Sequence, residues 1–271
     1  MKQPRAFGRV LPGPIQDPRP RKCNQSGLPN NVTIEVYVVS DVRHNIIFNT
    51  TKDFLLYICI FMNSVNAVFM SMECPDVRLA LVGAERSDED SAFTFGSDEL
   101  LNDLTTLDMF RRYANMKREH FGNPDIALLL TGRDIYESTR KGINRDIAGI
   151  AYAGGMCEEK FVAMAEDVPG SYSGVLNAAH EIGHSMGASH DGSPPDPHII
   201  GHPGSLKCNA SSGHIMTYVD GGALRYRFSE CSKDEIRHVL RQRGSRCWKI
   251  QAKEIYSVES IYPGRILSAH Q

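Results

Sequence analysis

His180-Glu181-Ile182-Gly183-His184-Ser185-Met186-Gly187-Ala188-Ser189-His190-Asp191 is the most informative stretch of this 271-residue sequence. Residues four apart on a helix lie on one face, about 6 Å apart along the axis, so His180 and His184 can bind one ion. Imidazole nitrogens suit zinc, and a catalytic zinc keeps three protein ligands with a fourth position open. His190 can be the third ligand if the chain turns sharply at Gly187, because glycine adopts a left-handed conformation without steric penalty. The stretch therefore predicts a Zn²⁺ site.

Glu181 lies between the first two histidines and need not bind the ion itself. A carboxylate there can hold a zinc-bound water and accept its proton, since zinc lowers the pKa of that water to about 7. The protonated Glu181 can then deliver the proton to a departing amine. The alternative is an exposed histidine-rich helix without metal, but a chance match of all fixed positions is on the order of one in ten million per chain. The pattern therefore predicts a peptidase with Glu181 as catalytic base.

HExxHxxGxxH followed by a methionine-containing turn is the signature of the metzincin peptidases. Gly213-His214-Ile215-Met216-Thr217-Tyr218 resembles that turn, and the resemblance implies that Met216 forms an apolar floor beneath the metal. Asp191, after the third histidine, resembles the reprolysin (adamalysin) branch, in which this aspartate forms hydrogen bonds within the lower lobe and fixes the turn. The resemblance extends from residue 32 to residue 248, and salivary reprolysins of blood-feeding arthropods look most similar.

Further segments resemble the same family. Residues 150–157 (IAYAGGMC) resemble its edge strand, against which a substrate lies extended, so the resemblance implies substrate binding by Ala151, Tyr152, Ala153 and Gly154. Free N–H and C=O groups on such an edge can pair with a peptide main chain. Residues 228–232 (FSECS) resemble the start of its C-terminal helix. The resemblance also implies two disulfides, Cys157–Cys247 and Cys208–Cys231.

Reprolysins often bind a structural calcium ion far from the zinc. Glu35 and Asp125 match two of its carboxylate ligands, and Cys247 matches a cysteine whose carbonyl contributes. The expected asparagine three residues later is Ile250, which has no oxygen ligand in its side chain. A Ca²⁺ ion needs oxygen ligands, so the calcium site is weakened, and ordinary polar groups at strand ends are the alternative.

Hydrophobic patterning predicts strands mixed with helices, followed by an irregular half. We expect strands at residues 32–40, 77–82, 126–131, 147–153 and 161–165. We expect helices at 54–72, from Ser97 to about His120, from Ser173 to near Gly187, and at 232–241 with Ser232 as cap. With the resemblance, this gives an α/β metzincin (zincin-like) domain: a twisted mixed five-stranded sheet with helices and a small irregular lower lobe.

We divide the chain into an N-terminal arm or propeptide remnant (1–31), a catalytic domain (32–248) and a C-terminal tail (249–271). Residues 1–30 hold no apolar run that could serve as a signal peptide, so we expect the sequence to be N-terminally incomplete or to begin inside a propeptide. Seven scattered cysteines and four Asn-x-Ser/Thr sequons favour a secreted, extracellular glycoprotein over a cytosolic protein with reduced thiols.

The remaining properties limit the partners. A formal net charge of −2 gives no reason to expect nucleic acid. The apolar stretch at 54–72 is interrupted by Asn63, Ser64 and Asn66, so a buried helix is favoured over a membrane span. We expect a monomer that acts on protein substrates, with extracellular matrix or plasma proteins as candidates.

Several residues keep more than one interpretation. Cys23, Cys59 and Cys74 remain after the two implied disulfides, and one pair could form among them. Cys23 could instead be a propeptide thiol that ligates zinc, although Asn24 replaces the glycine of the family's inhibitory motif. His198, His202 and His214 are expected to be ordinary loop histidines. Tyr218 could hydrogen-bond to the transition state, act as a labile ligand, or line the specificity pocket walled by residues 216–224.

The sequence as a whole predicts a secreted zinc-dependent metalloendopeptidase that hydrolyses internal peptide bonds through a zinc-bound water activated by Glu181. One rival is a secreted binding protein on the same scaffold, against which the intact Glu181 argues. The other is an incomplete or inactive fragment, which the odd number of cysteines keeps open.

Overall fold

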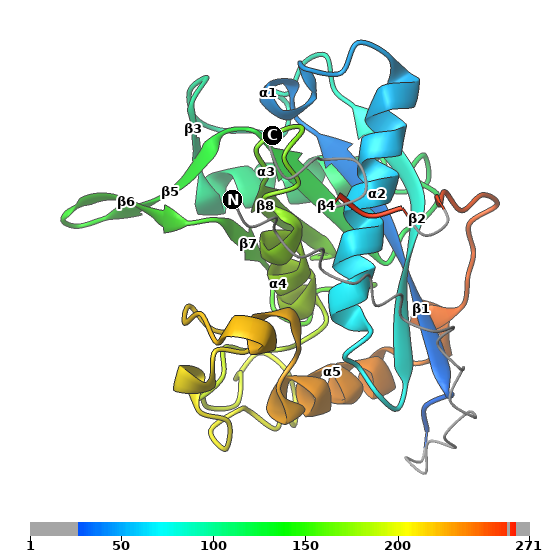
Figure 1. Ribbon diagram of the computed structural model, residues 1–271, viewed down its shortest axis with the longest axis vertical. Coiled ribbons are helices and arrows are strands. Elements are labelled where there is room, and N and C mark those ends of the chain that lie inside the picture. Colours follow the sequence, from blue (N-terminus) through cyan, green and yellow to red (C-terminus); the bar gives the residue numbers. More distant parts are fainter. Residues whose placement is uncertain (1–26, 259–260, 264–271) are drawn as a thin grey trace, which may run out of the picture.

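A central strand, β1 (Asn31–Ser40), organises the fold in the computed structural model, which describes residues 27–258 and 261–263 (Figure 1). Its β-branched run is buried from Ile34 onward. It pairs in parallel with β2 (Asp76–Arg86) and β4 (Ile126–Thr131). Next to β4 lie β8 (Val162–Glu166), also parallel, and the antiparallel edge strand β7 (Gly149–Ala151). The order β2-β1-β4-β8-β7 confirms the predicted mixed five-stranded sheet.

Helices cover both faces of this sheet because β1 is apolar on both faces. Its even-numbered residues, such as Ile34 and Val36, pack in one core cluster with α2 (Thr51–Phe69) and α4 (Val175–Ser185). Tyr37 and Val39 point to the other face and pack against α3 (Asp103–Met116). By length and composition α2 could cross a membrane, but ten of its side chains are buried in this core, as expected of a core helix.

The predicted helix from Ser97 to His120 is wrong at its start. Residues 100–102 form a short strand, β3 (Leu100–Asn102), and α3 begins only at Asp103. Asn102 is the N-cap, since its side chain accepts the N–H of Thr105 at 3.0 Å. The Ser97 hydroxyl instead accepts the N–H of Leu100 at 3.1 Å, in a turn before the strand. Asparagine caps a helix as well as serine does, so the sequence offers two possible N-caps, Ser97 and Asn102, and the helix begins after Asn102.

A second sheet was not predicted at all. It has the order β3-β5-β6, with β5 (Asp134–Thr139) and β6 (Gly142–Ile147) forming an antiparallel hairpin that projects from the domain (Figure 1). Most side chains of β5 and β6 are exposed, so the alternation of buried apolar and exposed polar residues that reveals a strand is missing. The strand expected at 147–153 is divided, because β6 ends at Ile147 and β7 spans only Gly149–Ala151.

The predicted C-terminal helix begins earlier than expected. It is α5 (Glu230–Arg243), and its cap is Ser229, whose hydroxyl accepts the N–H of Ser232 at 3.1 Å. Residues between α4 and α5 are largely irregular, as predicted, and form the lower lobe beneath α4 (Figure 1). The remaining elements are short: α1 (Val42–Asn45), α6 (Ser245–Trp248) and the 3-10 helices η1 (Ala210–Ser212) and η2 (Gly222–Tyr226).

Disulfides and the C-terminal segment tie the outer parts to the sheet. Cys157 is bonded to Cys247 and Cys208 to Cys231, the two pairs implied by the resemblance. Cys59 and Cys74 are both free, and Cys23 lies outside the described residues. Beyond Trp248, the N–H of Tyr256 donates to the carbonyl of Leu81 on β2 at 2.8 Å. The segment predicted as a tail therefore adds backbone pairing to the edge of the sheet, at least as far as Tyr256.

The free edge of β2 receives a second contact from within the domain. The side-chain amide of Asn66 on α2 donates to the carbonyl of Leu79 at 2.8 Å and accepts its N–H at 2.7 Å. This amide takes the place of a neighbouring strand at that residue. Asn66, which interrupts the apolar helix in the sequence, is thus explained by the strand beside it.

Candidate metal centre and active site

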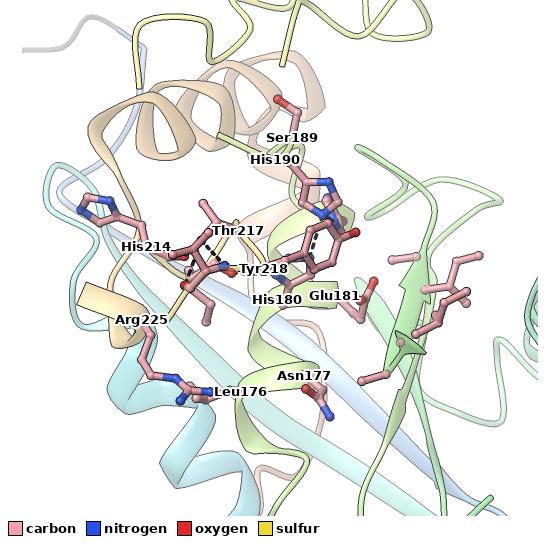
Figure 2. Close-up of a pocket in the computed structure, with 18 of the residues that line it drawn as sticks. Leu176, Asn177, His180, Glu181, Ser189, His190, His214, Thr217, Tyr218 and Arg225 are labelled. Carbon is pink, nitrogen blue, oxygen red and sulfur yellow. Dashed lines mark hydrogen bonds between the residues drawn. The ribbon is translucent and has the colours of Figure 1, made fainter. Parts of the chain in front are cut away.

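Three histidines converge at one point beneath the edge strand (Figure 2). The helix α4 places His180 and His184 on one face, and the chain returns after the helix to bring His190 opposite them. Nε2 of His190 lies 3.1 Å from Nε2 of His180 and 3.2 Å from Nε2 of His184. The spacing of the sequence therefore brings together the three residues proposed as ligands.

The other ring nitrogens show which tautomer these histidines adopt. Nδ1 of His180 donates to the carbonyl of Ile215, and Nδ1 of His184 donates to the carbonyl of Ala188, both at 2.7 Å. The lone pair of each Nε2 is thereby directed at the common point, the arrangement found in metal-binding histidines. Burial lowers the pKa of His180 to about 4 and that of His184 well below its ordinary value, so both rings are neutral. Burial also lowers the pKa of His190, and three imidazoles that favour the neutral form at this spacing fit a zinc ion.

Gly187 makes the return of the chain possible. It ends α4 with φ of +102°, a left-handed conformation that favours glycine. A Cβ atom at this position would overlap Cγ2 of Val239 on α5. The turn thus needs glycine both for its backbone and for its close contact with α5.

Glu235 of α5 holds the segment just before the third histidine. Its carboxylate accepts the N–H of Ser189 at 3.0 Å and the hydroxyl of Ser189 at 2.5 Å. The side chain is fully buried, and this burial raises the pKa of Glu235 to about 7. Local sequence patterns give Glu235 no role at the site, because its partner lies 46 residues away.

Asp191 and Met216 lie where the resemblance implied. The N–H of Asp191 donates to the carbonyl of Met216 at 3.0 Å, and its carboxylate accepts the hydroxyl of Ser229 at 2.6 Å. Met216 is fully buried beneath α4, and a Cβ atom on Gly183 would come within 2.9 Å of its sulfur. Gly183 therefore lets the methionine pack directly under the helix that carries the histidines.

Glu181 is buried beside the three histidines, with 6% of its surface exposed. Its Oε2 atom has no hydrogen-bond partner among the described residues, and burial raises the pKa of Glu181 to about 8. A buried carboxylate oxygen without a partner is costly to maintain, which points to a role with a ligand. Across from it lies Gly149, where a Cβ atom would come within 2.8 Å of Oε1. Gly149 was not among the predicted site residues, since its only signal in the sequence is a glycine at the start of an edge strand.

A cleft of about 700 Å³ runs past the histidines between β7 and the lower lobe. Ala151 and Ala153 line it, together with Gly149 and Ile150, whereas Tyr152 and Gly154 do not. The N–H of Gly154 donates to the carbonyl of His184 at 2.8 Å and is thus engaged within the domain. On the other side the cleft is lined by residues 217–220 and Arg225. Of the range 216–224 predicted to wall the specificity pocket, Met216 and residues 221–224 do not line this cleft.

Tyr218 stands on the open side of the histidine cluster (Figure 2). Its ring centroid lies 4.7 Å from that of His190 and 6.3 Å from that of His180, yet 84% of the residue is exposed. Among the loop histidines, His202 is buried and donates through Nε2 to the carbonyl of Gly187 at 2.8 Å. His198 is exposed, and His214 lines the cleft.

The two residues considered for calcium lie together but have other partners. Glu35 Oε1 accepts the N–H groups of Gln251 and Ala252 at 2.9 and 2.7 Å. Asp125 Oδ2 accepts the N–H of Glu35 at 2.8 Å, and burial raises the pKa of Asp125 to about 8. One oxygen of each carboxylate thus faces backbone N–H groups, whereas Oε2 of Glu35 is buried without a hydrogen-bond partner among the described residues, and the weakened calcium site stays a prediction.

Comparisons with known proteins agree with this geometry. A family model described as metallo-peptidase family M12B reprolysin-like matches residues 55–191. "A disintegrin and metalloproteinase with thrombospondin motifs like" from Bombyx mori is 31% identical over 78% of this chain and 32% of its own length. Two "venom metalloproteinase antarease-like" proteins are each 26% identical. TtrivMP_A of Tityus trivittatus aligns over 77% of this chain and 55% of its own length, and TfasMP_A of Tityus fasciolatus over 80% and 95%. The chain therefore spans about a third and about half of the first two relatives.

Proposed function

Because this chain belongs to the reprolysin-like M12B metallopeptidase family, we propose that it is a secreted zinc endopeptidase that hydrolyses internal peptide bonds of proteins. Membership makes it a hydrolase, and its three converging histidines fit the family's zinc. The observation that carries the endopeptidase proposal is the buried, unpartnered Oε2 of Glu181 at the wall of an open cleft. An open cleft admits the middle of a polypeptide, whereas a closed pocket would admit only an end.

The proposed mechanism assigns each step to a residue of this chain. Zinc, when bound by His180, His184 and His190, supplies a Lewis acid that polarises the scissile carbonyl and acidifies water. Glu181 accepts the proton of the attacking water and passes it to the departing amine. Burial raises the pKa of Glu181, and this carboxyl group would ionise more readily beside a cation held by the three histidines.

The edge strand is proposed to position the substrate. β7 is the last strand of its sheet, so a substrate chain can pair with its free N–H and C=O groups. Gly149 brings this edge into direct contact with Glu181, so a peptide bond held on β7 lies next to the base. Ala151 and Ala153 leave room for the substrate because their side chains are small.

Several finer properties remain proposals. Disulfides and relatives named as venom metalloproteinases support an extracellular location. Extracellular matrix or plasma proteins as substrates, a salivary setting, a monomeric state and the division at residues 32 and 248 are kept as predictions.

Zinc content and proteolysis test the proposal together. The whole chain is refolded with zinc, and cleavage of casein and gelatin is compared between the unchanged protein and Glu181→Gln. We expect one zinc per chain in both, with cleavage only in the unchanged protein and none after chelation. Zinc bound to both proteins without cleavage by either would favour the binding-protein alternative.

A further inference from the structure

The edge that borders the cleft is much longer than β7. The strands β6 and β7 follow each other with only Ala148 between them. Along this continuous segment, β6 pairs with β5 and β7 pairs with β8. Glu166, the last residue of β8, contacts both β5 and the residue between β6 and β7. The carboxylate of Glu166 accepts the N–H of Ile135 at 2.5 Å, and the backbone N–H of Glu166 donates to the carbonyl of Ala148 at 2.9 Å. Both paired neighbours therefore lie on the same side, which leaves the other side of residues 142–151 as one edge.

In the part of the chain that the structure describes, neither β6 nor β7 has a paired strand on this second side. Within the described residues β6 ends one sheet and β7 ends the other. The cleft reaches the base of the hairpin, since Asp146, Ile147 and Ala148 line it together with Gly149. Ten residues of strand span about 33 Å, whereas β7 alone spans about 10 Å. The hairpin thus continues this edge beyond the cleft, and Figure 1 shows that it projects from the domain.

We propose that the free edge of the β5–β6 hairpin is a docking surface for the substrate polypeptide itself. It pairs with an extended segment on one side of the scissile bond, and this inference rests on the proposed peptidase function. The segment is continuous with the portion held on β7, so no second partner is needed. The edge also keeps an exposed apolar side chain, Ile143, which is 58% exposed and gains contacts when a strand is added.

The charged tip of the hairpin indicates which residues the bound substrate segment should carry. Arg140 and Lys141 form the turn, both are exposed, and neither forms an ion pair among the described residues. Arg145 is different, because it pairs with Asp134 across the hairpin. The turn lies eight residues before Gly149, so a substrate must extend about 26 Å beyond the scissile bond to reach it. We therefore expect preferred substrates to carry Asp or Glu about eight residues from the bond on that side.

Peptides of different length test this proposal on the whole chain. A short peptide with four residues on each side of the cleaved bond is compared with versions extended by eight residues at either end. The extensions carry either acidic or basic residues at their far ends. We expect extension at one end only to raise kcat/KM about tenfold for the acidic version, since several strand pairs and an ion pair add up to such a gain. High salt should reduce the difference between acidic and basic versions.

Two variants then assign the gain to the hairpin. In the first, Asn-Gly replaces residues 138–143, joining Glu137 and Asn144, which already pair. In the second, Arg140→Glu and Lys141→Glu reverse the charge of the tip, with Lys52→Glu and Lys253→Glu as a matched control on exposed residues outside the cleft. We expect the first variant to lose the gain and the second to prefer the basic extension, while the control keeps the original preference.

The outcomes separate this inference from the proposed function. If no protein cleaves the short peptide although zinc is bound, the peptidase proposal fails. If the short peptide is cleaved but neither extension helps, or the gain survives shortening of the hairpin, the docking proposal fails. Unchanged zinc content and unchanged turnover of the short peptide show that each variant has kept its catalytic centre.

Discussion

Gly149 on the edge strand lies directly against the carboxylate of Glu181, so closely that a Cβ atom at residue 149 would lie 2.6 Å from its Cγ atom. The strand proposed to hold the substrate and the proposed base are thus in contact, although 32 residues separate them in the sequence. In the proposed mechanism this contact links substrate binding directly to proton transfer.

Gly149→Ala is therefore expected to impair catalysis while the metal site stays intact. The methyl group must displace Glu181, and a shift of about 1 Å at a catalytic group can cost about a hundredfold in rate. We expect kcat to fall with little change in zinc content or thermal midpoint. Glu181→Asp in the same background shortens the side chain and should recover part of the loss. Full activity in Gly149→Ala would show that the contact does not position the base.

Gly187→Ala should affect the metal site itself. The residue has φ of +102°, and a Cβ atom would overlap Val239, so the substitution strains both the backbone and the packing. We expect a loss of about 2 kcal/mol in the free energy of unfolding and weaker zinc binding in competition with a chelator. Val239→Ala added to Gly187→Ala removes the overlap but not the backbone strain, and should restore stability only in part. Recovery to the full value would mean that the left-handed conformation is unimportant.

Glu235→Gln should weaken zinc binding without removing a ligand. Glu235 fixes both polar groups of Ser189 beside His190, and loss of such supporting contacts costs about ten- to a hundredfold in metal affinity. The expected readout is the zinc concentration at half-saturation. A comparison with Glu230→Gln, an exposed residue on the same helix, controls for the change of charge.

Glu235 should also make the stability of the metal-free protein depend on pH. Burial raises the folded pKa of Glu235 to about 7, above its value of about 4.3 in an unfolded chain. The folded state therefore binds the proton more tightly, and its contribution is complete below pH 4.3 and lost as the pH rises through about 7. Urea unfolding between pH 5 and pH 8 should show a smaller decline for Glu235→Gln than for the unchanged protein. Parallel curves for the two proteins would contradict this assignment.

Calcium is expected to have no effect on the stability of this chain. Oε1 of Glu35 and Oδ2 of Asp125 already accept N–H groups from residues 35, 251 and 252, so only the other oxygen of each carboxylate is left for an ion that takes about six oxygen ligands. A bound ion at a hundred times its dissociation constant would stabilise the fold by about 2.7 kcal/mol. Thermal unfolding of the zinc-loaded protein with and without millimolar calcium chloride measures the difference. A clear rise in the midpoint would restore the calcium site that the substitution at Ile250 argued against.

The sequence predicted the central fold because its strongest patterns are local. The spacing from His180 to His190 and the β-branched run of β1 each depend on neighbouring residues, and the structure places both as expected. Gly149 and Glu235 were missed because their importance comes from partners 32 and 46 residues away. The β5–β6 hairpin was missed because its exposed strands lack an apolar face. Local patterns thus predicted the main elements and the histidine spacing, whereas contacts between distant residues and solvent-exposed strands could not be predicted from them.

The two outer edges of the five-stranded sheet are treated in opposite ways. At β2, Asn66 and Tyr256 occupy backbone groups that another strand would otherwise use. At β7 the corresponding groups face the cleft. A sheet with both edges exposed can pair edge to edge with further copies of itself without limit. A sheet with a single open edge can accept only one further strand. Removal of the residues after Trp248 would free the backbone groups of Leu81 on β2. Both edges of the sheet could then pair with other strands, and we expect the shortened protein to aggregate.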